Sequence, residues 1–393
     1  MKKYELLAPA GDFPMLTTAI NAGADAVYFG LKEFSLRANA RNFELKDIDK
    51  INLICKPKRI KKYLTLNSII YNDELEKVEN IIKKVKGKVD AIICWDLSVI
   101  QLCKKYKIPF HISTQASISN IESAKFYKKL GAERIILARE LNIKQIKEII
   151  KKASIKVEVF IHGAMCLAVS GRCLMSQFLF NKSANRGECI HPCRRSYTIK
   201  DNQEGYELKV ENNHVLSAKD LCALPFIEQL KNAGVTCFKI EGRNRDPRYL
   251  DSVVRIYRKA LYNKLNEQEI KNSIEELKKV YNKGFSSGFY LGLPTPKDFS
   301  NAEHSNATEK KKFVGKITNY YSKINVATIK LVSGLKVGDN IAIIGKTTGI
   351  THSVINRIEI HGKSVNSGIK GQEIGIKLPP VKKNEEVYVI IKN

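Results

Sequence analysis

The sequence predicts a (β/α)8 TIM-like barrel, joined by a short linker to a small all-β barrel domain. In the first 245 residues, eight short apolar runs alternate with amphipathic stretches, the pattern of parallel strands joined by helices. After residue 312 the pattern changes to closely spaced alternating runs, which is typical of antiparallel sheets. A doubly wound open sheet is the main alternative. The count of eight, and the lack of G-x-G-x-x-G after the first run, favour the barrel.

The barrel strands are expected where apolar residues run together. They are residues 4–8, 25–30, 62–67, 91–95, 109–114, 134–138, 157–163 and 236–242. Stretches with helical periodicity, such as residues 142–153, separate most of them. Gly23, Gly131 and Gly234 each stand between such a helix and the next strand. Because glycine tolerates the left-handed conformation that often ends a helix, we expect these glycines to be helix C-caps.

The domain boundaries follow from composition and loop length. Residues 1–290 form the predicted barrel domain, in which an insertion of residues 164–235 separates the last two strands. A connection of this length is uncommon unless it is functional. Residues 297–312 are polar and are expected to form the linker, and residues 313–393 form the C-terminal domain. The alternating runs of that domain are 314–321, 325–331, 339–345, 353–360, 373–378 and 386–391.

Composition and charge narrow the class of protein. The 393 residues are 44% hydrophobic and 27% charged, which is ordinary for a globular protein. The chain lacks an apolar run long enough to span a membrane, and it starts too polar for a signal peptide, so we expect a cytoplasmic protein with reduced thiols and no membrane partner. The net charge of +27 favours a polyanionic partner such as RNA. The alternative is a lysine-rich proteome in which every surface carries such charge.

Several predicted strands are followed directly by charged residues. In a barrel of this type the active site is built at the carboxyl ends of the strands. The candidates there are Arg37, Arg41, Glu140, His162, Glu241 and Arg243. Each could instead cap a helix or form a structural ion pair, but their convergence at one end of the barrel predicts a site.

Four of the nine cysteines lie in the insertion with the spacing C-x6-C-x15-C-x3-C: Cys166, Cys173, Cys189 and Cys193. In a reducing compartment such a dense group of thiols most often holds a metal. Structural zinc sites usually use C-x2-C pairs, whereas a cubane 4Fe–4S cluster takes thiolates from separated points. We therefore expect an iron–sulfur cluster. Cys222 is an alternative to Cys193 as fourth ligand, and a set of buried thiols without metal is the plainer interpretation.

Several longer motifs resemble a known family. They are ELLAPAG, AGADAVYFG, FSLRANARNF, HGAMC followed by SGRC, ANRGECIHPCR, and SAKDLC followed by FKIEGR. Together they are similar to peptidase family U32, also called collagenase-like, over about residues 1–290. The resemblance implies Cys166, Cys173 and Cys189 as cluster ligands, with either Cys193 or Cys222 as the fourth.

The resemblance implies two different activities. Some members of this family hydroxylate RNA bases, in association with an iron–sulfur cluster and with prephenate as hydroxyl source. On this basis we expect an enzyme that forms 5-hydroxyuridine at the wobble position of tRNA, with a ribosomal RNA cytidine as the alternative target. The family name implies a peptidase instead. The sequence has no G-x-S-x-G or H-E-x-x-H motif, but His162 and Cys166 are close enough in sequence for a Cys–His pair.

The hydroxylase interpretation assigns roles to the strand-end residues. A dicarboxylate such as prephenate would be clamped by arginines, namely Arg37, Arg41, Arg172 and Arg243. Proton transfer would fall to His162, Glu140 and Glu241. A partner subunit or electron donor is left open. A third interpretation is a non-catalytic protein that binds RNA or senses redox state. The charged residues at the strand ends argue against it, because a scaffold without catalytic activity would not need them. The C-terminal domain resembles the small β-barrels of translation factors, and we expect it to hold RNA or to pack on the barrel.

Overall fold

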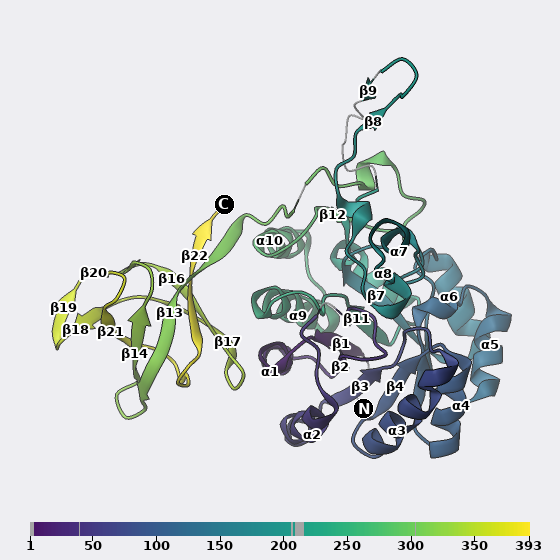
Figure 1. Cartoon of the computed structure of the whole chain (residues 1–393), viewed down its shortest axis with the longest axis horizontal. Helices are drawn as coiled ribbons and strands as arrows, with labels where there is room; N and C mark the ends of the chain where they lie inside the picture. The colour runs from purple at the N-terminus through teal and green to yellow at the C-terminus, as the bar shows by residue number, and fades with distance from the viewer. Residues whose placement is uncertain (1–3, 39, 206, 209–215, 303) are drawn as a thin grey trace.

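The computed structural model describes residues 4–38, 40–205, 207–208, 216–302 and 304–393. It has two parts, a barrel covered by helices and a separate β domain that contains the C-terminus (Figure 1). Within the described ranges, the structure contains no helix that combines the length and the apolar character needed to cross a membrane.

Parallel strands close the barrel in the described part of the chain. They are β1 (Glu5–Ala10), β2 (Ala26–Gly30), β3 (Lys61–Thr65), β4 (Ala91–Cys94), β5 (Phe110–Ile112), β6 (Arg134–Ile136), β7 (Lys156–Gly163) and β11 (Cys237–Ile240). Neighbours in this order are hydrogen-bonded, and β11 pairs with both β1 and β7, which closes the ring. Each predicted strand overlaps one of these strands. The prediction of a (β/α)8 barrel rather than an open sheet is therefore confirmed.

Helices surround the barrel (Figure 1). They are α1 (Phe13–Ala22), α2 (Ile48–Cys55), α3 (Leu75–Val85), α4 (Leu97–Tyr106), α5 (Ile121–Leu130), α6 (Ile143–Ala153), α8 (Ile227–Asn232), α9 (Pro247–Tyr262) and α10 (Glu267–Lys278). Gly23 and Gly131 cap α1 and α5 with φ of 101° and 105°, so these two predicted caps are confirmed. Ala233 is the C-cap of α8, and Gly234, with φ of 93°, stands one residue beyond it.

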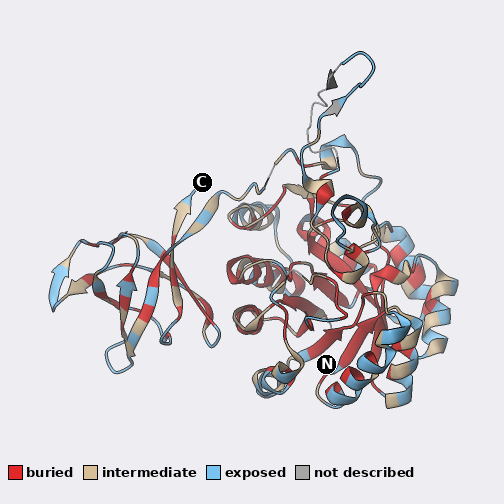
Figure 2. Cartoon of the chain, in the orientation of Figure 1, coloured by how far each residue is buried: buried red, intermediate tan, exposed pale blue. Residues whose placement is uncertain are grey.

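Burial is concentrated on the barrel strands and on the helix faces turned toward them (Figure 2). Every residue of β2 and of β4 is buried, because one face of the closed sheet is covered by helices and the other is enclosed in the barrel. This accounts for strands that appear in the sequence as continuous apolar runs rather than as alternating patterns.

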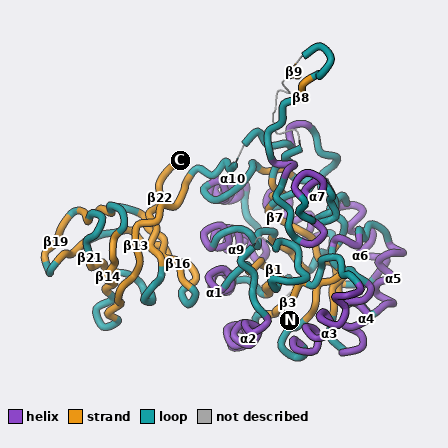
Figure 3. The backbone as a smooth tube through the Cα atoms, viewed as in Figure 1, coloured by secondary structure: helices purple, strands orange, loops and turns teal. Residues whose placement is uncertain are grey.

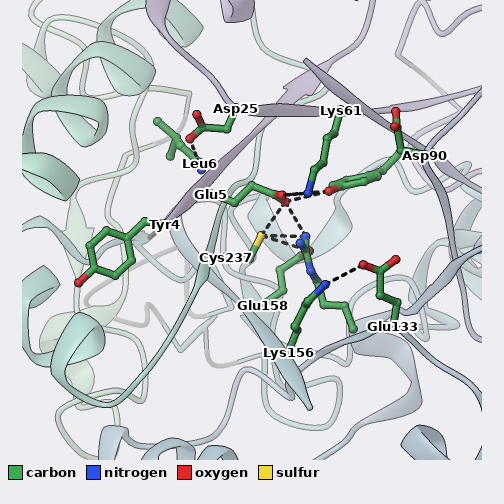
Figure 4. Close-up of polar contacts among 12 residues, drawn as sticks. Tyr4, Glu5, Leu6, Asp25, Lys61, Asp90, Glu133, Lys156, Glu158 and Cys237 are labelled. Atoms are coloured by element: carbon green, nitrogen blue, oxygen red, sulfur yellow. Dashed lines mark hydrogen bonds and ion pairs between the residues drawn. The ribbon is translucent and has the colours of Figure 1, made fainter. Parts of the chain in front are cut away.

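The interior of the barrel also holds a charged cluster near the amino ends of the strands. Glu158 is fully buried, with its carboxylate 3.2 Å from Arg134 Nη1 and 2.9 Å from Lys239 Nζ. Arg134 Nη1 also lies 2.7 Å from Glu5 Oε1 and 3.1 Å from Cys237 Sγ. Figure 4 shows Glu5, Glu158 and Cys237 of this cluster, which come from β1, β7 and β11, lying close together. Buried charges are costly unless they are paired, so this network satisfies each charge within the barrel.

The insertion after β7 contains short elements, of which α7, β8 and β9 are labelled in Figure 1. They are α7 (Met175–Phe180), β8 (Ile199–Lys200), β9 (Glu207–Leu208) and β10 (Asp220–Cys222). Strand β10 runs antiparallel to the carboxyl end of β7 and also pairs with β12 (Phe285–Ser286). The insertion is thereby fixed to the mouth of the barrel, where a barrel enzyme builds its site.

The C-terminal domain is an antiparallel sheet with its own apolar core (Figure 3). Its strands are β13 (Glu309–Tyr321), β14 (Val326–Leu331), β16 (Asn340–Gly345), β17 (Gly349–Val354), β18 (Ile358–Ile360), β19 (Lys363–Val365), β21 (Glu373–Lys377) and β22 (Glu386–Lys392), with a separate short pair of β15 (Leu335–Lys336) and β20 (Ser367–Gly368). Strand β13 begins inside the stretch that we expected to be linker, because Glu309 already pairs with Lys392 of β22.

The C-terminal domain packs against α1 of the barrel through the β16–β17 hairpin. Thr17 Oγ1 donates to the carbonyl oxygen of Lys346 over 2.8 Å, and Asn21 Nδ2 donates to that of Thr348 over 3.2 Å. A Cβ at Gly349 would lie 2.8 Å from the backbone nitrogen of Thr18, so only glycine allows this approach. The two parts of the chain are therefore docked on one another.

Candidate active site

A cavity of about 530 Å³ lies at the carboxyl ends of the barrel strands, between the loops after β2, β7 and β11 and the insertion. Four of the five cysteines of the insertion line it: Cys166, Cys173, Cys189 and Cys193. We refer to it as the cysteine cavity. Other polar side chains in its lining are Arg37, His191, Arg194, Glu241 and Arg245.

Two glycines allow the insertion to lie against the loop that follows β2. The backbone N–H of Ala38 donates to the carbonyl oxygen of Gly187 over 2.9 Å. Gly187 has φ of 89°, and a Cβ there would lie 2.6 Å from the carbonyl oxygen of Ser35. Gly171 has φ of 81°, and a Cβ there would meet Leu36 at the same distance. These close approaches bring the cysteines over the mouth of the barrel.

The chemistry around the thiols fits an iron–sulfur cluster. None of the four described cysteines forms a disulfide. Cys189 Sγ accepts hydrogen bonds from the backbone N–H of His191 at 3.4 Å and from Ser176 Oγ at 3.7 Å. Such donors stabilise sulfur in its negatively charged form. The pKa of Arg37 is raised, first by Glu241 and further by the negative charges of Cys166 and Cys189, so a cation also stands beside the thiols.

The arrangement does not match a site for one metal ion. Among the residues that the structure describes, no group of three or more His, Cys, Asp or Glu side chains is placed to hold a single ion. In a cubane cluster each of the four cysteines binds a different iron atom, so the four thiols do not converge on one ion. The four thiols that line one cavity match the number of ligands that a cubane cluster takes.

Cys222 lies apart from these four thiols. It is on β10, opposite His162 of β7, and it is 4% exposed. Its Sγ lies 3.7 Å from Tyr257 Oη, and burial raises the pKa of the thiol to about 11. The lining of the cysteine cavity includes Cys193 and not Cys222, so the geometry favours Cys193 as the fourth member of the set.

Arg37 and Glu241 form an ion pair across the mouth of the barrel. Arg37 Nε lies 3.2 Å from Glu241 Oε1. Burial acts to raise the pKa of Glu241, but the charges of Arg37, Arg243 and Arg139 lower it overall. One carboxylate thus faces three guanidinium groups, and it is ionised at neutral pH.

A smaller chamber of about 40 Å³ lies deeper in the barrel mouth. Arg37 and Glu241 line both the chamber and the cysteine cavity. Lys239, Arg243 and Gln115 also line the chamber. Lys239 Nζ lies 4.5 Å from the centroid of the Tyr28 ring. The chamber is therefore enclosed by the cations Arg37, Lys239 and Arg243, by the carboxylate of Glu241 and by neutral hydrogen-bonding groups.

Arg243 is buried in the wall of this chamber without a carboxylate as hydrogen-bond partner among the described residues. Its guanidinium donates to Ser35 Oγ at 2.9 Å, to Thr65 Oγ1 at 3.1 Å and to the carbonyl oxygen of Leu36. Burial lowers the pKa of Arg243 to about 10. Its hydrogen-bond partners are neutral, and the carboxylate that offsets its charge, Glu241, also faces Arg37 and Arg139, so positive charge remains for a ligand to offset.

Arg139 is a second buried cation at this end of the barrel. Its Nη1 donates to the carbonyl oxygen of Ala164 over 3.0 Å, and its guanidinium lies 4.6 Å from the centroid of the Phe160 ring. Its Nε and Nη2 atoms are buried and have no hydrogen-bond partner in the structure. Burial lowers the pKa of Arg139. The region around Glu241 therefore carries an excess of positive charge.

Two residues proposed for proton transfer lie away from both cavities. His162 is 1% exposed, and its ring is surrounded by those of Tyr249, Tyr257 and Phe285 at centroid distances of 6.0, 5.5 and 5.6 Å. Burial lowers the pKa of His162 to about 3. Glu140 is exposed and does not line either cavity. Of the three residues proposed for proton transfer, the structure brings only Glu241 to the site.

The proposed arginine clamp is divided in the structure. Arg37 and Arg243 line the chamber. Arg41 pairs with Asp12 at 3.0 Å and lines a different cavity. Arg172 lies over the ring of Trp95, 5.2 Å from its centroid, and donates to the carbonyl oxygen of Gln115. Arg41 and Arg172 therefore do not join Arg37 and Arg243 around one ligand.

Lys239 and Tyr28 are among the chamber residues that the sequence did not identify. Lys239 lies in the middle of β11 and Tyr28 in the middle of β2. The sequence did carry a signal for Lys239, because a lysine within an otherwise apolar strand must either pair or face a polar space. Tyr28 gave no such signal, since tyrosine is common in strands.

The chain forms a closed parallel barrel. At the carboxyl ends of its strands lie charged side chains and a cysteine-bearing insertion, and this is the architecture of a barrel enzyme. The model of peptidase family U32 matches residues 11–299. The chain is 39% identical to a protein named collagenase from Porphyromonas gingivalis, over 98% of this chain and 97% of that protein.

Two further relatives bear the names of RNA-modifying proteins. The chain is 34% identical to tRNA hydroxylation protein P1 of Bacillus subtilis, over 90% of this chain and 86% of that protein. It is 42% identical to 23S rRNA 5-hydroxycytidine C2501 synthase of Escherichia coli, over 66% of this chain and 39% of that protein. The chain belongs to peptidase family U32, as its motifs indicated, and it is an enzyme of that family.

Proposed function

We propose that this enzyme hydroxylates a pyrimidine base of RNA with the help of an iron–sulfur cluster, and that its product is 5-hydroxyuridine at the wobble position of tRNA. The observation that carries the proposal is the convergence at one barrel mouth of four cysteines and of three arginines that face a single carboxylate. The names of the relatives from Bacillus subtilis and Escherichia coli support RNA hydroxylation as the class of reaction.

The cluster would be held by the four cysteines that line one cavity: Cys166, Cys173, Cys189 and Cys193. When bound, a 4Fe–4S cluster supplies one-electron redox chemistry. The protein contributes the hydrogen bonds to Cys189 Sγ and the positive charge of Arg37, which offset the charge of the thiolates.

The excess of positive charge around Glu241 supports an anionic co-substrate. Arg37 and Arg243 both line the chamber, where Glu241 is the carboxylate that faces them, so an anionic ligand would offset the remaining positive charge. A dicarboxylate such as prephenate meets this requirement and is our proposed hydroxyl donor. The ionised carboxylate of Glu241 stands beside it and can accept a hydrogen bond or a proton.

RNA is the proposed partner because of charge and access. A net charge of +27 favours binding of a polyanion. An enzyme that reacts with a base must take the base out of its stack, and the cysteine cavity of about 530 Å³ offers the space. A ribosomal RNA cytidine is the second candidate target.

The peptidase alternative is favoured by one observation, the similarity to the collagenase of Porphyromonas gingivalis. A Cys–His nucleophile would need His162 beside Cys166. His162 is enclosed by aromatic rings and does not line the cavity that Cys166 lines. The geometry therefore favours the hydroxylase.

Mass spectrometry of nucleosides tests the proposal. We expect a hydroxylated pyrimidine, 5-hydroxyuridine in tRNA, in cells that carry the gene and not in cells from which it is deleted. The wild-type gene and a Cys222→Ala control should restore the nucleoside, whereas Cys166→Ser should not. An unchanged set of modified nucleosides in both tRNA and rRNA after deletion would refute RNA hydroxylation.

A further inference from the structure

A second cavity, of about 320 Å³, adjoins the cysteine cavity and shares Asn244 and Arg245 with it. One wall consists of the loops after β1, β2 and β11 of the barrel. The other wall belongs to the C-terminal domain and includes Lys311 and Tyr388. We refer to it as the interdomain cavity, since neither part of the chain forms it alone.

Contacts around the interdomain cavity fix the C-terminal domain in place. Lys311 Nζ lies 2.8 Å from Asp246 Oδ2 at the start of α9. Arg248 of α9 forms an ion pair with Glu309 of β13. Together with the hydrogen bonds between α1 and the β16–β17 hairpin, these contacts hold Tyr388 at a set position beside the barrel mouth.

The lining of this cavity places the aromatic ring of Tyr388 among cations, and Tyr281 of the adjoining cysteine cavity stands beside Arg245, which both cavities share. The ring of Tyr388 packs against Phe313 with centroids 5.5 Å apart, and Lys311 Nζ lies 4.8 Å from the Tyr388 centroid. On the barrel side the guanidinium of Arg245 lies 3.4 Å from the centroid of Tyr281. Proteins bind single-stranded nucleic acid with this combination, because the bases stack on the rings while the cations attract the phosphates.

The charges that line the cavity nearly balance. The cations are Arg41, Arg243, Arg245 and Lys311, and the carboxylates are Asp12, Asp246 and Glu386. Asp12 and Asp246 are also N-cap residues, which accept backbone N–H groups of α1 and α9. The guanidinium of Arg243 is held in the chamber by Ser35 and Thr65, and the three other cations balance the three carboxylates. A lining without surplus positive charge disfavours an acidic peptide with several carboxylates more than it disfavours one phosphodiester, which carries one negative charge.

We propose that the interdomain cavity binds the nucleotide next to the reacting one, with its base on Tyr388 and its phosphate between Arg245 and Lys311. This inference rests on the proposed function, because it takes single-stranded RNA as the substrate. The reacting base occupies the cysteine cavity on the other side of Arg245. The C-terminal domain thereby forms one wall of the substrate cleft and takes a direct part in RNA recognition.

RNA binding by the full-length protein tests this proposal. The probe is a fluorescently labelled RNA stem–loop with an unpaired loop, followed by anisotropy. Tyr388→Leu removes the ring, and we expect it to weaken binding roughly 10-fold, whereas Tyr388→Phe keeps the ring and should bind as the wild type does. Lys311→Gln should weaken binding and reduce the slope of log Kd against log salt by about 1.

Matched controls lie at the other end of β13. Tyr321 is 48% exposed and Lys323 follows it in an exposed turn, so Tyr321→Leu and Lys323→Gln change the same residue types away from the cavity. They should leave binding unchanged. Equal effects of the control variants and the cavity variants on RNA binding would overturn the proposal. If Tyr388→Leu does not fold, the comparison of Lys311→Gln with Lys323→Gln decides whether the proposal holds.

The result for the wild type separates this proposal from the proposed function. A wild-type protein that fails to bind the stem–loop refutes both the RNA substrate and the cavity assignment. A wild-type protein that binds RNA as tightly as all the cavity variants do refutes the cavity assignment alone. The same variants are tested with a polyglutamate peptide. If Lys311→Gln abolished binding of the peptide but left RNA binding unchanged, the cavity would be assigned to a peptide and the proposal would be overturned.

Discussion

Arg37 Nε lies 3.2 Å from Glu241 Oε1, which joins the loop after β2 to the end of β11 across the barrel mouth. Arg37 has a left-handed backbone with φ of 68°, a conformation that costs energy for a residue other than glycine and that often marks functional sites. Both residues line the cysteine cavity and the inner chamber. The pair therefore stands where the proposed RNA base and the proposed donor would meet.

Breaking this pair should be costly, because each partner leaves the other as a largely buried charge. We expect Arg37→Gln or Glu241→Gln alone to lower the free energy of unfolding by about 3 kcal/mol. The double variant should lose clearly less than the sum of the two single losses. Urea unfolding of the four proteins measures this coupling, and strictly additive losses would show that the pair does not act as a unit.

The charged cluster inside the barrel predicts how stability depends on pH. Burial alone would raise the pKa of Glu5, but the charge and hydrogen bond of Arg134, together with Lys61, lower it to about 2. A carboxyl group with a lower pKa in the folded state than in the unfolded state stabilises the fold above the unfolded pKa, near 4.5. This contribution, about 3 kcal/mol, should be lost as the pH falls from 4.5 through 2.

Urea unfolding of the wild type and of Glu5→Gln at several pH values checks this expectation. The variant lacks the titrating group, so its stability should change less with pH over the same range. A wild-type protein whose stability fell no more steeply than that of Glu5→Gln would contradict the role assigned to the Glu5–Arg134 contact (Figure 4).

The positions of Cys193 and Cys222 predict different results for their substitution. Cys193 lines the cysteine cavity, whereas Cys222 is buried beside Tyr257. Cys193→Ser should therefore purify with much less iron than the wild type, and Cys222→Ala should keep its iron. Iron analysis of the two variants, purified without oxygen, distinguishes them. The reverse result would make Cys222 the fourth ligand.

The buried charge of Arg243 predicts a response to a dicarboxylate. Prephenate should raise the Tm of the wild type, since a ligand that binds only the folded state stabilises it. Arg243→Met should remove this rise. Arg41→Met is the matched control, because the Arg41 side chain is 81% exposed and lies in the interdomain cavity. An equal rise in all three proteins, or an equal rise with citrate, would argue against a donor site beside Arg243 at the barrel mouth.

The barrel could be predicted from the sequence because its signals are local. Each strand is a short apolar run, and Gly23 and Gly131 mark helix ends through their own conformational freedom. The cysteine set was also visible, since its four members lie close together in the chain. These features depend on neighbours in sequence, so a single chain reveals them.

The chamber and the interdomain cavity could not be predicted in the same way. Arg41 and Arg243 both follow strand ends, yet the Arg41 side chain turns to Asp12 and that of Arg243 to Ser35. Which way a side chain points depends on packing between distant segments. The approach of Tyr388 to the barrel mouth depends on the docking of an entire domain, for which the sequence offered no local signal.

The central claim is that the four clustered cysteines hold a 4Fe–4S cluster. It is tested most directly by iron and acid-labile sulfide analysis of the wild-type protein, purified without oxygen, together with its absorption spectrum. The account predicts about four irons and four sulfides per chain, with a broad absorption band near roughly 400 nm. A protein that contains only zinc, or no metal after reconstitution with iron and sulfide, would contradict it.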